Sequence, residues 1–468
     1  MVAPAVQEEE GRLVRVAPVD VVELQALRVE IVRRRPEHLG LFGHACGVAR
    51  PSRFAEGRAP VAGSPAMAGA LDGVRVLELG IWVAVPSAAA VLADWGARVV
   101  KIEPPEGDPL RGLAATGLVP YQPDVNPAFQ LDNRGKRSVT LDLRRPEGRE
   151  VAHALVRRSD VFLTNLRRQK LAPLGMDYAT LRRVHPRLVY AGLTGYGTEG
   201  PERERAAFDY AAFWARAGIM GSLGEPEGPP PTQRPGMGDH MTGLGLAGAI
   251  AAALFARERS GVGQEIGMSL FGSGIWMLAS DIQAAITTGY CHTPGGRRAA
   301  PNPLFNFYRT SDGRWLHLVM LQPDRHWRTF CRAVGREDLV DDPRFASAPV
   351  RFQHCRELIA ILDPLFATRP LAEWAEVLDG ADCYWGKVQT VEEVSHDAQA
   401  EAIGAFADTA LPDGRPLRIV KSPVAFGATP SAVAGPAPEL GQHTEEVLLE
   451  AGFGWEDIAR LKDAGALG

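Results

Sequence analysis

The stretch LDGVRVLELGIWVAVPSAAAVLADWGARVVKIE, residues 71–103, decides the fold class. It begins with the apolar run GVRVLEL, which predicts a buried strand. A helix of small residues is expected over 86–97, because Pro86 suits a first helical turn and Gly96 suits a helix end. A second strand is predicted over 98–103. A strand, a helix and a strand in this order are typical of a parallel β-α-β unit.

The same alternation continues along the chain. Further strands are predicted over 137–143, 160–165, 187–197 and 264–270, and helices over 146–159, 240–260 and 271–286. This order predicts an α/β fold with a mostly parallel sheet and helices on both faces. The turn after the first strand, LGIWVAVPS, lacks G-x-G-x-x-G, which disfavours a nicotinamide-dependent dehydrogenase.

The sequence pattern departs from this alternation of strands and helices at two places. Residues 1–70 contain one candidate amphipathic helix over 19–35, followed by a linker rich in Pro, Gly and Ala. From Asn302 a hairpin pattern appears, with a turn at 311–313, and amphipathic helices follow it.

These changes predict three parts. An N-terminal extension and linker occupies 1–70. A large domain is built from 71–295 and 392–468, and a small domain occupies 300–391.

Composition and charge exclude several classes of partner and binding site. The 468 residues carry a net charge of −5 without a basic stripe, which disfavours a nucleic-acid partner. The longest apolar run, 244–256, is only about two-thirds of a membrane span, so we expect a buried helix and no membrane partner. The N-terminus lacks a signal-peptide pattern, and the five scattered cysteines form no C-x-x-C. The histidines lack ligand spacing. We therefore expect a cytoplasmic protein without a metal site.

One carboxylate is conspicuous. The stretch RPGMGDHMTGLGLAG, residues 234–248, contains a single acidic residue, Asp239, in front of a long helix of Gly, Ala and Leu. Taken alone, Asp239 could simply cap that helix. It could also be a nucleophile, since the start of a helix would keep its carboxylate ionised.

Several stretches together resemble one family. In chain order they are LDGVRVLELG, LADWGARVVKIEPPEGDPLR, DNRGKRSVTLDLRRPEGRE, PRLVYAGLTGYGTEGPE, PGMGDHMTGL, ALFARERSGVGQEIGMSL, YRTSDGRWLHL and ELGQHTEEVL. This ordered set resembles the family III coenzyme A (CoA) transferases. They include formyl-CoA and carnitine CoA-transferases and the related α-methylacyl-CoA racemases. The first 70 residues lie outside the resemblance.

The resemblance implies a fold and a reaction. The fold is a Rossmann-like large domain built from both chain ends, a smaller inserted α+β domain, and two chains interlocked as a dimer. The reaction moves CoA from an acyl-CoA donor to a free carboxylic acid through aspartyl mixed-anhydride and aspartyl-CoA thioester intermediates, with no cofactor besides CoA. By resemblance the nucleophile is Asp239.

Three glycines are candidates near the intermediates. Gly238 could bring a backbone N–H to an oxyanion. Gly295 and Gly296 resemble a glycine loop that covers the intermediates in formyl-CoA transferase, although the loop here, PGGRR, is shorter and more basic and could be an ordinary turn.

The CoA contacts follow from the resemblance more loosely. The turn after the first strand would hold the adenine end, and a basic pair would face the phosphates. Pro104 and Pro173 stand where formyl-CoA transferase has arginines, so phosphate recognition would differ, with Arg111 or Arg167 as substitutes. The candidate CoA-binding residues are Trp82, Val83, Ala84, Lys136, Arg137, Asn165, Leu166 and Tyr196.

Two alternatives remain open. A racemase needs two bases, and Phe208 stands at the histidine of its His-Asp pair, which leaves Asp209. His240 could substitute. Phe208 also belongs to an aromatic cluster that could be core or could line an acyl pocket. The second alternative is a non-catalytic CoA-binding subunit in a heteromer, against which the presence of Asp239 argues. The sequence does not identify the donor and acceptor acids.

Overall fold

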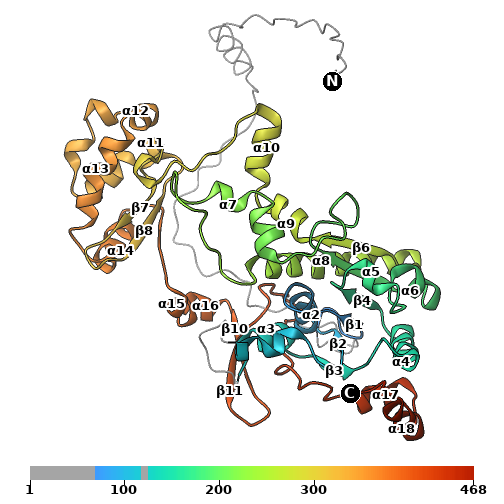
Figure 1. The fold of residues 1–468 in the computed structure, drawn as a ribbon. Helices are drawn as coiled ribbons and strands as arrows, with labels where there is room; N and C mark the ends of the chain where they lie inside the picture. Colours follow the sequence, from blue (N-terminus) through green and yellow to red (C-terminus); the bar gives the residue numbers. More distant parts are fainter. Residues whose placement is uncertain (1–68, 117–124) are drawn as a thin grey trace, which may run out of the picture. The chain divides into compact units, whose positions relative to one another are not determined.

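The structure is a computed structural model that describes residues 69–116 and 125–468 (Figure 1). The chain divides into two units, Met1–Gly57 and Arg58–Gly468. The helix expected over 19–35 and nearly all of the N-terminal extension lie outside the described residues.

A six-stranded sheet forms the centre, with every neighbouring pair parallel and the order β3-β2-β1-β4-β5-β6. The parallel sheet predicted from the sequence is therefore confirmed. Its strands are β1 (Arg75–Leu79), β2 (Arg98–Glu103), β3 (Arg137–Thr140), β4 (Val161–Thr164), β5 (Val189–Thr194) and β6 (Glu265–Ser269). Strand order reverses between β1 and β4, and ligands of such sheets bind outside the carboxyl ends at that point.

The sheet is covered on both faces, because successive side chains of a strand point to opposite sides. Val76 of β1 packs in one apolar core together with residues of α2 (Ala84–Asp94) and α8 (Met237–Ser260). Leu77, the next residue, packs in a second core on the other face. That core also contains residues of α4 (Pro146–Arg157), α6 (Tyr178–Val184), α17 (Thr444–Ala451) and α18 (Trp455–Asp463).

Helix α8 packs very closely on α2. A Cβ on Gly243 would lie 2.2 Å from Ser87 Oγ and 2.8 Å from Ala84 O, so only glycine fits there. Within the described part of the chain, α8 is the one helix long and apolar enough to cross a membrane. Its buried residues, among them Leu246 and Ile250, pack here in the core of the first face.

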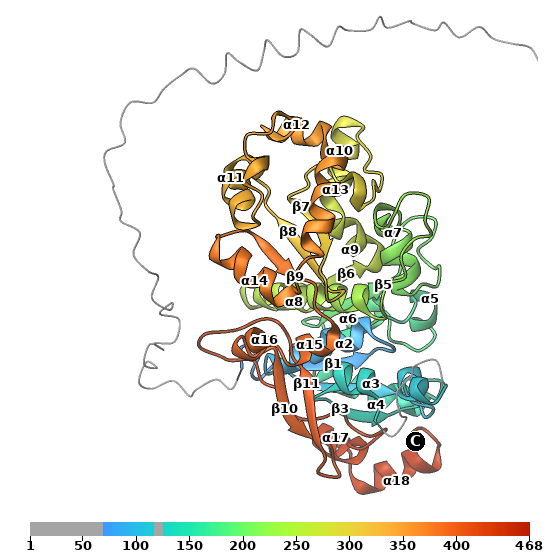
Figure 2. The same ribbon diagram turned by 90° about the vertical axis from the view of Figure 1, so that its left-hand side faces the viewer.

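The end of the chain returns to the sheet (Figure 2). His443 N donates to Ser138 O, Asp142 N donates to Ala466 O, and Leu141 forms a β-bridge with Leu467. The strand predicted over 137–143 is therefore shorter than expected, since β3 ends at Thr140 and the next residues pair with the C-terminus.

Residues 304–383 have an apolar core of their own, which includes Tyr308, Phe330 and Trp374. The predicted hairpin is confirmed: β7 (Phe305–Arg309) pairs antiparallel with β8 (Trp315–Val319), and β9 (Trp385–Lys387) joins β8. Four helices complete this part, α11 (Pro323–Ala333), α12 (Ala348–Gln353), α13 (Cys355–Phe366) and α14 (Leu371–Gly380). The domain boundaries proposed from the sequence stay a prediction.

Two other details differ from the sequence predictions. The helix expected over 271–286 is two helices, α9 (Leu270–Met277) and α10 (Ala279–Thr288), which meet at Leu278. A hairpin of β10 (Phe406–Ala410) and β11 (Pro416–Val420) was not expected. The short remaining elements are η1 (Pro109–Thr116), α3 (Pro127–Asn133), α5 (Arg168–Leu171), η2 (Tyr210–Ala215), α7 (Ile219–Ser222), η3 (Arg297–Ala299), η4 (Glu337–Leu339), η5 (Pro343–Phe345), α15 (Val391–Ser395) and α16 (Ala398–Ala402).

Candidate active site

The turn between β1 and α2 lies where the strand order reverses, and side chains from other segments fix its shape. Asn165, which follows β4, accepts from Ile81 N at 3.0 Å and donates to Ile81 O at 2.8 Å. Asp108 accepts from Trp82 N at 3.1 Å. Trp82 has a φ of 63°, a left-handed conformation that is uncommon and costly for a tryptophan. The turn proposed to hold CoA is thus a strained loop kept rigid by its surroundings.

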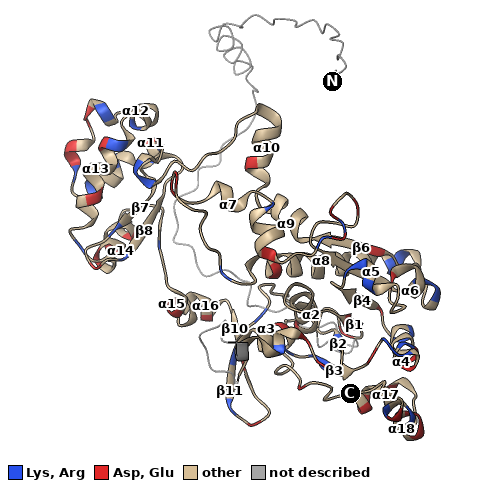
Figure 3. Ribbon diagram, viewed as in Figure 1, with Lys and Arg blue, Asp and Glu red and all other residues tan. Residues whose placement is uncertain are grey.

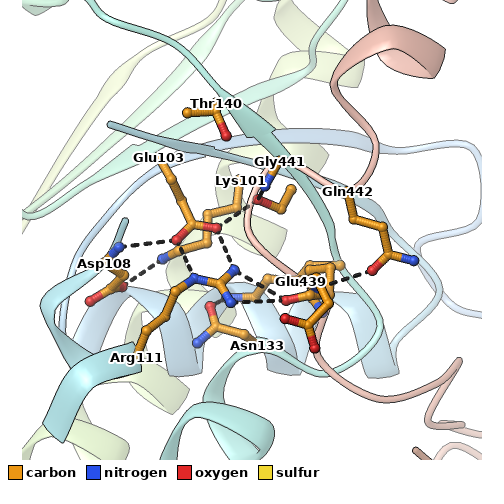
Figure 4. A network of polar contacts seen from close by, with 12 residues as sticks. Lys101, Glu103, Asp108, Arg111, Asn133, Thr140, Glu439, Gly441 and Gln442 are labelled. Carbon is orange, nitrogen blue, oxygen red and sulfur yellow. Dashed lines mark hydrogen bonds and ion pairs between the residues drawn. The ribbon is translucent and has the colours of Figure 1, made fainter. Parts of the chain in front are cut away.

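A buried polar network lies behind this turn (Figure 4). Lys101 Nζ donates to Gly80 O, Asp108 Oδ2 and Glu78 Oε1, each at 2.9 Å. Glu103 accepts from Nε and Nη2 of Arg111 at 2.8 and 2.7 Å. Burial opposes ionisation of Glu103, but the bonds and charge of Arg111 outweigh it and lower its pKa. Arg111 is therefore already paired and is a poor substitute for a missing phosphate ligand.

The basic pair predicted to face CoA phosphates has internal partners. Lys136 Nζ is buried, 2.7 Å from Glu78 Oε2 and 3.0 Å from Asn133 Oδ1. Burial lowers the pKa of Lys136 to about 8, against the pull of Glu78. Arg137 lies 2.8 Å from Glu450 on α17. The fold thus supplies each charge with a carboxylate, Lys136 in a buried pair and Arg137 in an exposed one, and their role at the CoA phosphates stays a prediction.

Asp239 is the third residue of α8, and its carboxylate is only partly buried. The N-cap is Gly236, in the left-handed conformation with φ 75°. Asp239 is therefore not the cap of the helix, which was its alternative role. Burial, together with a smaller contribution from the charge of Asp209, raises the pKa of Asp239 to about 7. Burial and the second carboxylate therefore both oppose the ionisation that the helix start was expected to favour.

Asp209 lies directly against the start of α8. It is 1% exposed, and its Oδ2 accepts from Gly238 N at 3.2 Å. Burial raises the pKa of Asp209, although the Gly238 N–H opposes the shift. The N–H of Gly238 is thus engaged with Asp209, not free for an oxyanion. What requires a glycine there is packing, since a Cβ would lie 2.6 Å from the ring of Phe213.

His240 pairs with a carboxylate that the sequence gave no reason to select. Its Nε2 lies 2.9 Å from Asp132 Oδ1, and Asp132 is 1% exposed at the end of α3. Burial works against the imidazolium, yet the hydrogen bond and charge of Asp132 prevail and raise the pKa of His240. The two residues are 108 positions apart in the chain, so only the fold could reveal the pair.

Aromatic side chains lie beside the turn and next to Asp209. The rings of Trp82 and Phe208 meet edge to face with centroids 5.7 Å apart. Phe208 is 58% exposed and Tyr210 41% exposed, whereas Phe213 is buried. Phe213 is thus core, while Phe208 and Tyr210 offer apolar surface beside Asp209 and are not packed away.

The glycine loop and Tyr196 lie in other surroundings. Gly295 and Gly296 line a hollow of about 1470 Å³ whose lining includes Arg297, Arg298, Arg309 and Arg356 but not Asp239. Tyr196, after β5, lies at 6.2 Å from the ring of Phe271 and under the guanidinium of Arg205 at 5.4 Å. The single chain therefore does not bring these three predicted residues together with Asp239.

An apolar pocket of about 320 Å³ opens at the carboxyl ends of β1, β2 and β4. Its lining includes Ile81, Pro104, Leu166 and Arg144. Pro104 and Leu166, two departures from the resembled sequences, thus come together in one pocket and make it apolar.

Comparison with known proteins places the chain in a family. The sequence pattern described as CoA-transferase family III matches residues 71–444. The (R)-2-hydroxy-4-methylpentanoate CoA-transferase of Clostridioides difficile is 35% identical over 395 residues, covering 84% of this chain and 98% of that protein. The cinnamoyl-CoA:phenyllactate CoA-transferase of Clostridium sporogenes is 34% identical, covering 84% and 95%.

A solved structure agrees with these relatives. The crystal structure of a CAIB/BAIF family protein from Brucella suis superposes with a TM-score of 0.73 at 31% identity, covering 81% of this chain and 99% of that one. The chain therefore belongs to CoA-transferase family III.

Proposed function

We propose that this CoA-transferase works through Asp239 as a covalent nucleophile. The observation that carries the proposal is the placement of Asp239. Its carboxylate is partly exposed, has a pKa near 7, and lies in the first turn of α8 close to Asp209. A pKa near the working pH gives a carboxylate that is ionised in useful amount and more nucleophilic than an ordinary aspartate.

The proposed reaction conserves the energy of the thioester. The Asp239 oxygen attacks the acyl-CoA carbonyl, a C–O bond forms, and the C–S bond breaks with its electron pair on sulfur. The CoA thiolate then attacks the Asp239 carbonyl of the anhydride and releases the donor acid. The acceptor carboxylate attacks the Asp239 carbonyl of the aspartyl-CoA thioester, which forms a second anhydride and breaks the C–S bond with its electron pair on sulfur. The thiolate then attacks the acceptor carbonyl of that anhydride, which forms the acceptor acyl-CoA and frees the Asp239 carboxylate. No metal or further cofactor is needed.

We place the CoA at the reversal of strand order. The turn at Trp82–Ala84 would hold the nucleotide end, and the apolar pocket with Pro104 and Leu166 would receive the adenine. The candidate phosphate ligands are Arg167, nearby in sequence, and Arg144 at this pocket. Arg144 pairs with Asp142 at 2.8 Å but its side chain is 69% exposed, whereas Lys136 and Arg111 are held in largely buried ion pairs.

The test is the variant Asp239→Asn, which retains the shape and removes the nucleophile. We expect turnover to fall by at least about a thousandfold while the fold persists. Wild-type enzyme mixed with a donor acyl-CoA should yield an adduct that hydroxylamine traps, and peptide mapping should place it on Asp239. Near-normal turnover of the variant, or an adduct on another carboxylate, would contradict the proposal.

We also propose an interlocked homodimer. Large apolar side chains are exposed on α8, α9 and α10, among them Phe255, Trp276 and Ile286, and α9 carries no charged residue (Figure 3). Such a surface usually marks an interface. Tagged and untagged dimers should fail to exchange subunits unless they are unfolded. A folded, active monomer in light scattering would exclude the interlocked arrangement.

The alternatives make different predictions. A racemase would exchange the α proton of a 2-methylacyl-CoA with deuterated water, whereas we expect no labelling, because Phe208 cannot act as a base. A non-catalytic subunit of a heteromer would be inactive when purified alone. Screening acyl-CoA and free-acid pairs on the lone chain by mass spectrometry separates these cases and identifies the acids.

A further inference from the structure

The pair of Asp132 and His240 has the features of a catalytic or binding pair and not only of a structural contact between α3 and α8. Asp132 is buried at the end of α3, and the imidazole side chain of His240 is 41% exposed on α8. A buried carboxylate thus holds one nitrogen of a ring whose remainder is open to a ligand. Carboxylates hold imidazole rings in this way where the other nitrogen or the ring charge is needed.

Space for the ring is provided by a glycine. A Cβ on Gly236 would lie 3.3 Å from Cε1 and 3.5 Å from Nδ1 of His240. Val83 of the turn proposed to hold CoA lies against the same glycine, 3.4 Å from that Cβ position. The ring of His240 and the side chain of Val83 therefore lie on the same side of Gly236, and His240 is next to Asp239 in the sequence. Among the hydrogen bonds of the described residues, none uses Nδ1.

The charges around the nucleophile are unbalanced without His240. The groups that act on Asp239 are the carboxylates of Asp209 and Asp132, and His240 is the one cation among them in the described part of the chain. Arg134 faces His240 from the end of α3, but its guanidinium is paired with Asp94 at 2.7 Å. Negative charge that develops beside Asp239 therefore has His240 as its cation in the described part of the chain. Asp132 holds one ring nitrogen of His240, and the other is uncommitted among the hydrogen bonds of those residues.

We propose that the imidazolium of His240, oriented by Asp132, binds the sulfur of CoA and stabilises the thiolate that leaves and returns during transfer. The inference rests on the proposed covalent role of Asp239. His240 would be a catalytic residue, and Asp132 a positioning residue.

The step balances without proton transfer. When Asp239 attacks the thioester, the C–S electron pair moves to sulfur, and the thiolate forms an ion pair with the imidazolium, as thiolates do beside protonated histidines. When sulfur attacks the next carbonyl, the pair returns to carbon and the imidazolium is unchanged. Each transfer uses this ion pair twice, once for each anhydride.

The experiment compares His240→Gln, Asp132→Asn and a matched control in the full-length enzyme. The control is His354→Gln, which breaks a second His-carboxylate pair, 2.8 Å from Glu357, in the part with its own core. Steady-state rates are measured from pH 5.5 to 9 with an acyl-CoA donor. We expect kcat of His240→Gln to fall about a hundredfold with KM changed less than about threefold, as for loss of one charge-stabilising group.

The pH profile separates catalysis from stability. Wild-type activity should fall at high pH as His240 loses its proton, and this alkaline limb should disappear in His240→Gln. The acid limb should move to higher pH, because Asp239 loses its counter-charge. In Asp132→Asn the alkaline limb should move to lower pH, since the pKa of His240 falls. The apparent pKa values of the two limbs belong to Asp239 and His240 as a coupled pair and not to either residue alone.

A kcat of His240→Gln within threefold of wild type and an unchanged profile would overturn the inference. Trapping the adduct tells the two proposals apart: if Asp239 still forms its adduct in that case, only the role of His240 is wrong. Absence of the adduct in wild-type enzyme contradicts the nucleophile itself. If His240→Gln does not fold, His240→Asn and Asp132→Asn carry the same test.

Discussion

We predict that Asp239 destabilises the fold in a pH-dependent way. Its pKa rises from 3.8 to about 7 on folding, so the folded state holds the proton more tightly and loses stability as pH rises from about 4 to 7. Asp239→Asn removes this cost. At pH 8 the variant should be more stable than wild type by about 1–2 kcal/mol, a discounted share of the full shift because the group is partly exposed. Thermal unfolding at pH 4.5 and pH 8 measures it.

The matched control is Asp281→Asn. Asp281 holds the same third position in α10. Asp281→Asn should lower the free energy of unfolding by a few tenths of a kcal/mol at pH 8, because the favourable interaction of the carboxylate with the helix dipole is lost. Equal effects of the two substitutions would show that Asp239 bears no special cost.

Asp209 is expected to set the pH dependence of the proposed nucleophile, Asp239. Its charge is the largest electrostatic contribution, after burial, to the raised pKa of Asp239. Asp209→Asn retains an oxygen for the Gly238 N–H and removes the charge. The pKa of Asp239 should fall and the acid limb of kcat/KM should move to lower pH. The ratio of activity at pH 6 to that at pH 8 should rise about two- to fivefold. If the acid limb of kcat/KM does not move, the charge of Asp209 does not influence the ionisation of Asp239.

Helix α8 shows how one element links the core to the site. Gly243→Ala would place a Cβ against Ser87 Oγ and Ala84 O and push α8 away from α2. We expect a loss of about 1–3 kcal/mol in the free energy of unfolding by denaturant. Because α8 carries Asp239 one turn away, kcat should also fall.

Gly380→Ala is the control for this element. Gly380 ends α14, and its Cβ would meet nothing within 4 Å. Alanine should be neutral or slightly stabilising there. If the two substitutions behaved alike, close contact of α8 and α2 would not be what requires glycine.

On the scale of the whole molecule, the family match begins at residue 71. We therefore predict that residues 1–60 are dispensable for transfer. Deletion should leave kcat and KM within about twofold of the full chain, since the sheet, α2 and α8 all follow the deleted segment. A folded truncation that has lost activity would show that the extension contributes to the site.

The contacts of the C-terminus predict a different result at the other end. Deletion of residues 441–468 would remove Leu448 and Leu461 from the core and the partners of β3. Such a chain should fail to fold, which limited proteolysis would reveal. The two truncations together define the folded unit.

The sequence alone determined the parallel α/β sheet, the hairpin near 311–313 and the place of Asp239 at the start of a glycine-rich helix. These follow from periodicity, turn residues and short-range order, which are local in the chain. It also pointed to Asn165 and to the turn at Trp82, although not to the bond that joins them.

Only the tertiary structure decided the electrostatics of the site. Lys136 and Arg137 read as phosphate ligands in sequence, but the fold gives them Glu78 and Glu450 as partners. Asp132 had no local signal at all, and it holds His240 from 108 residues away. The pKa of a carboxylate depends on burial and on charges within a few ångströms, and both are set by which distant segments the fold brings together.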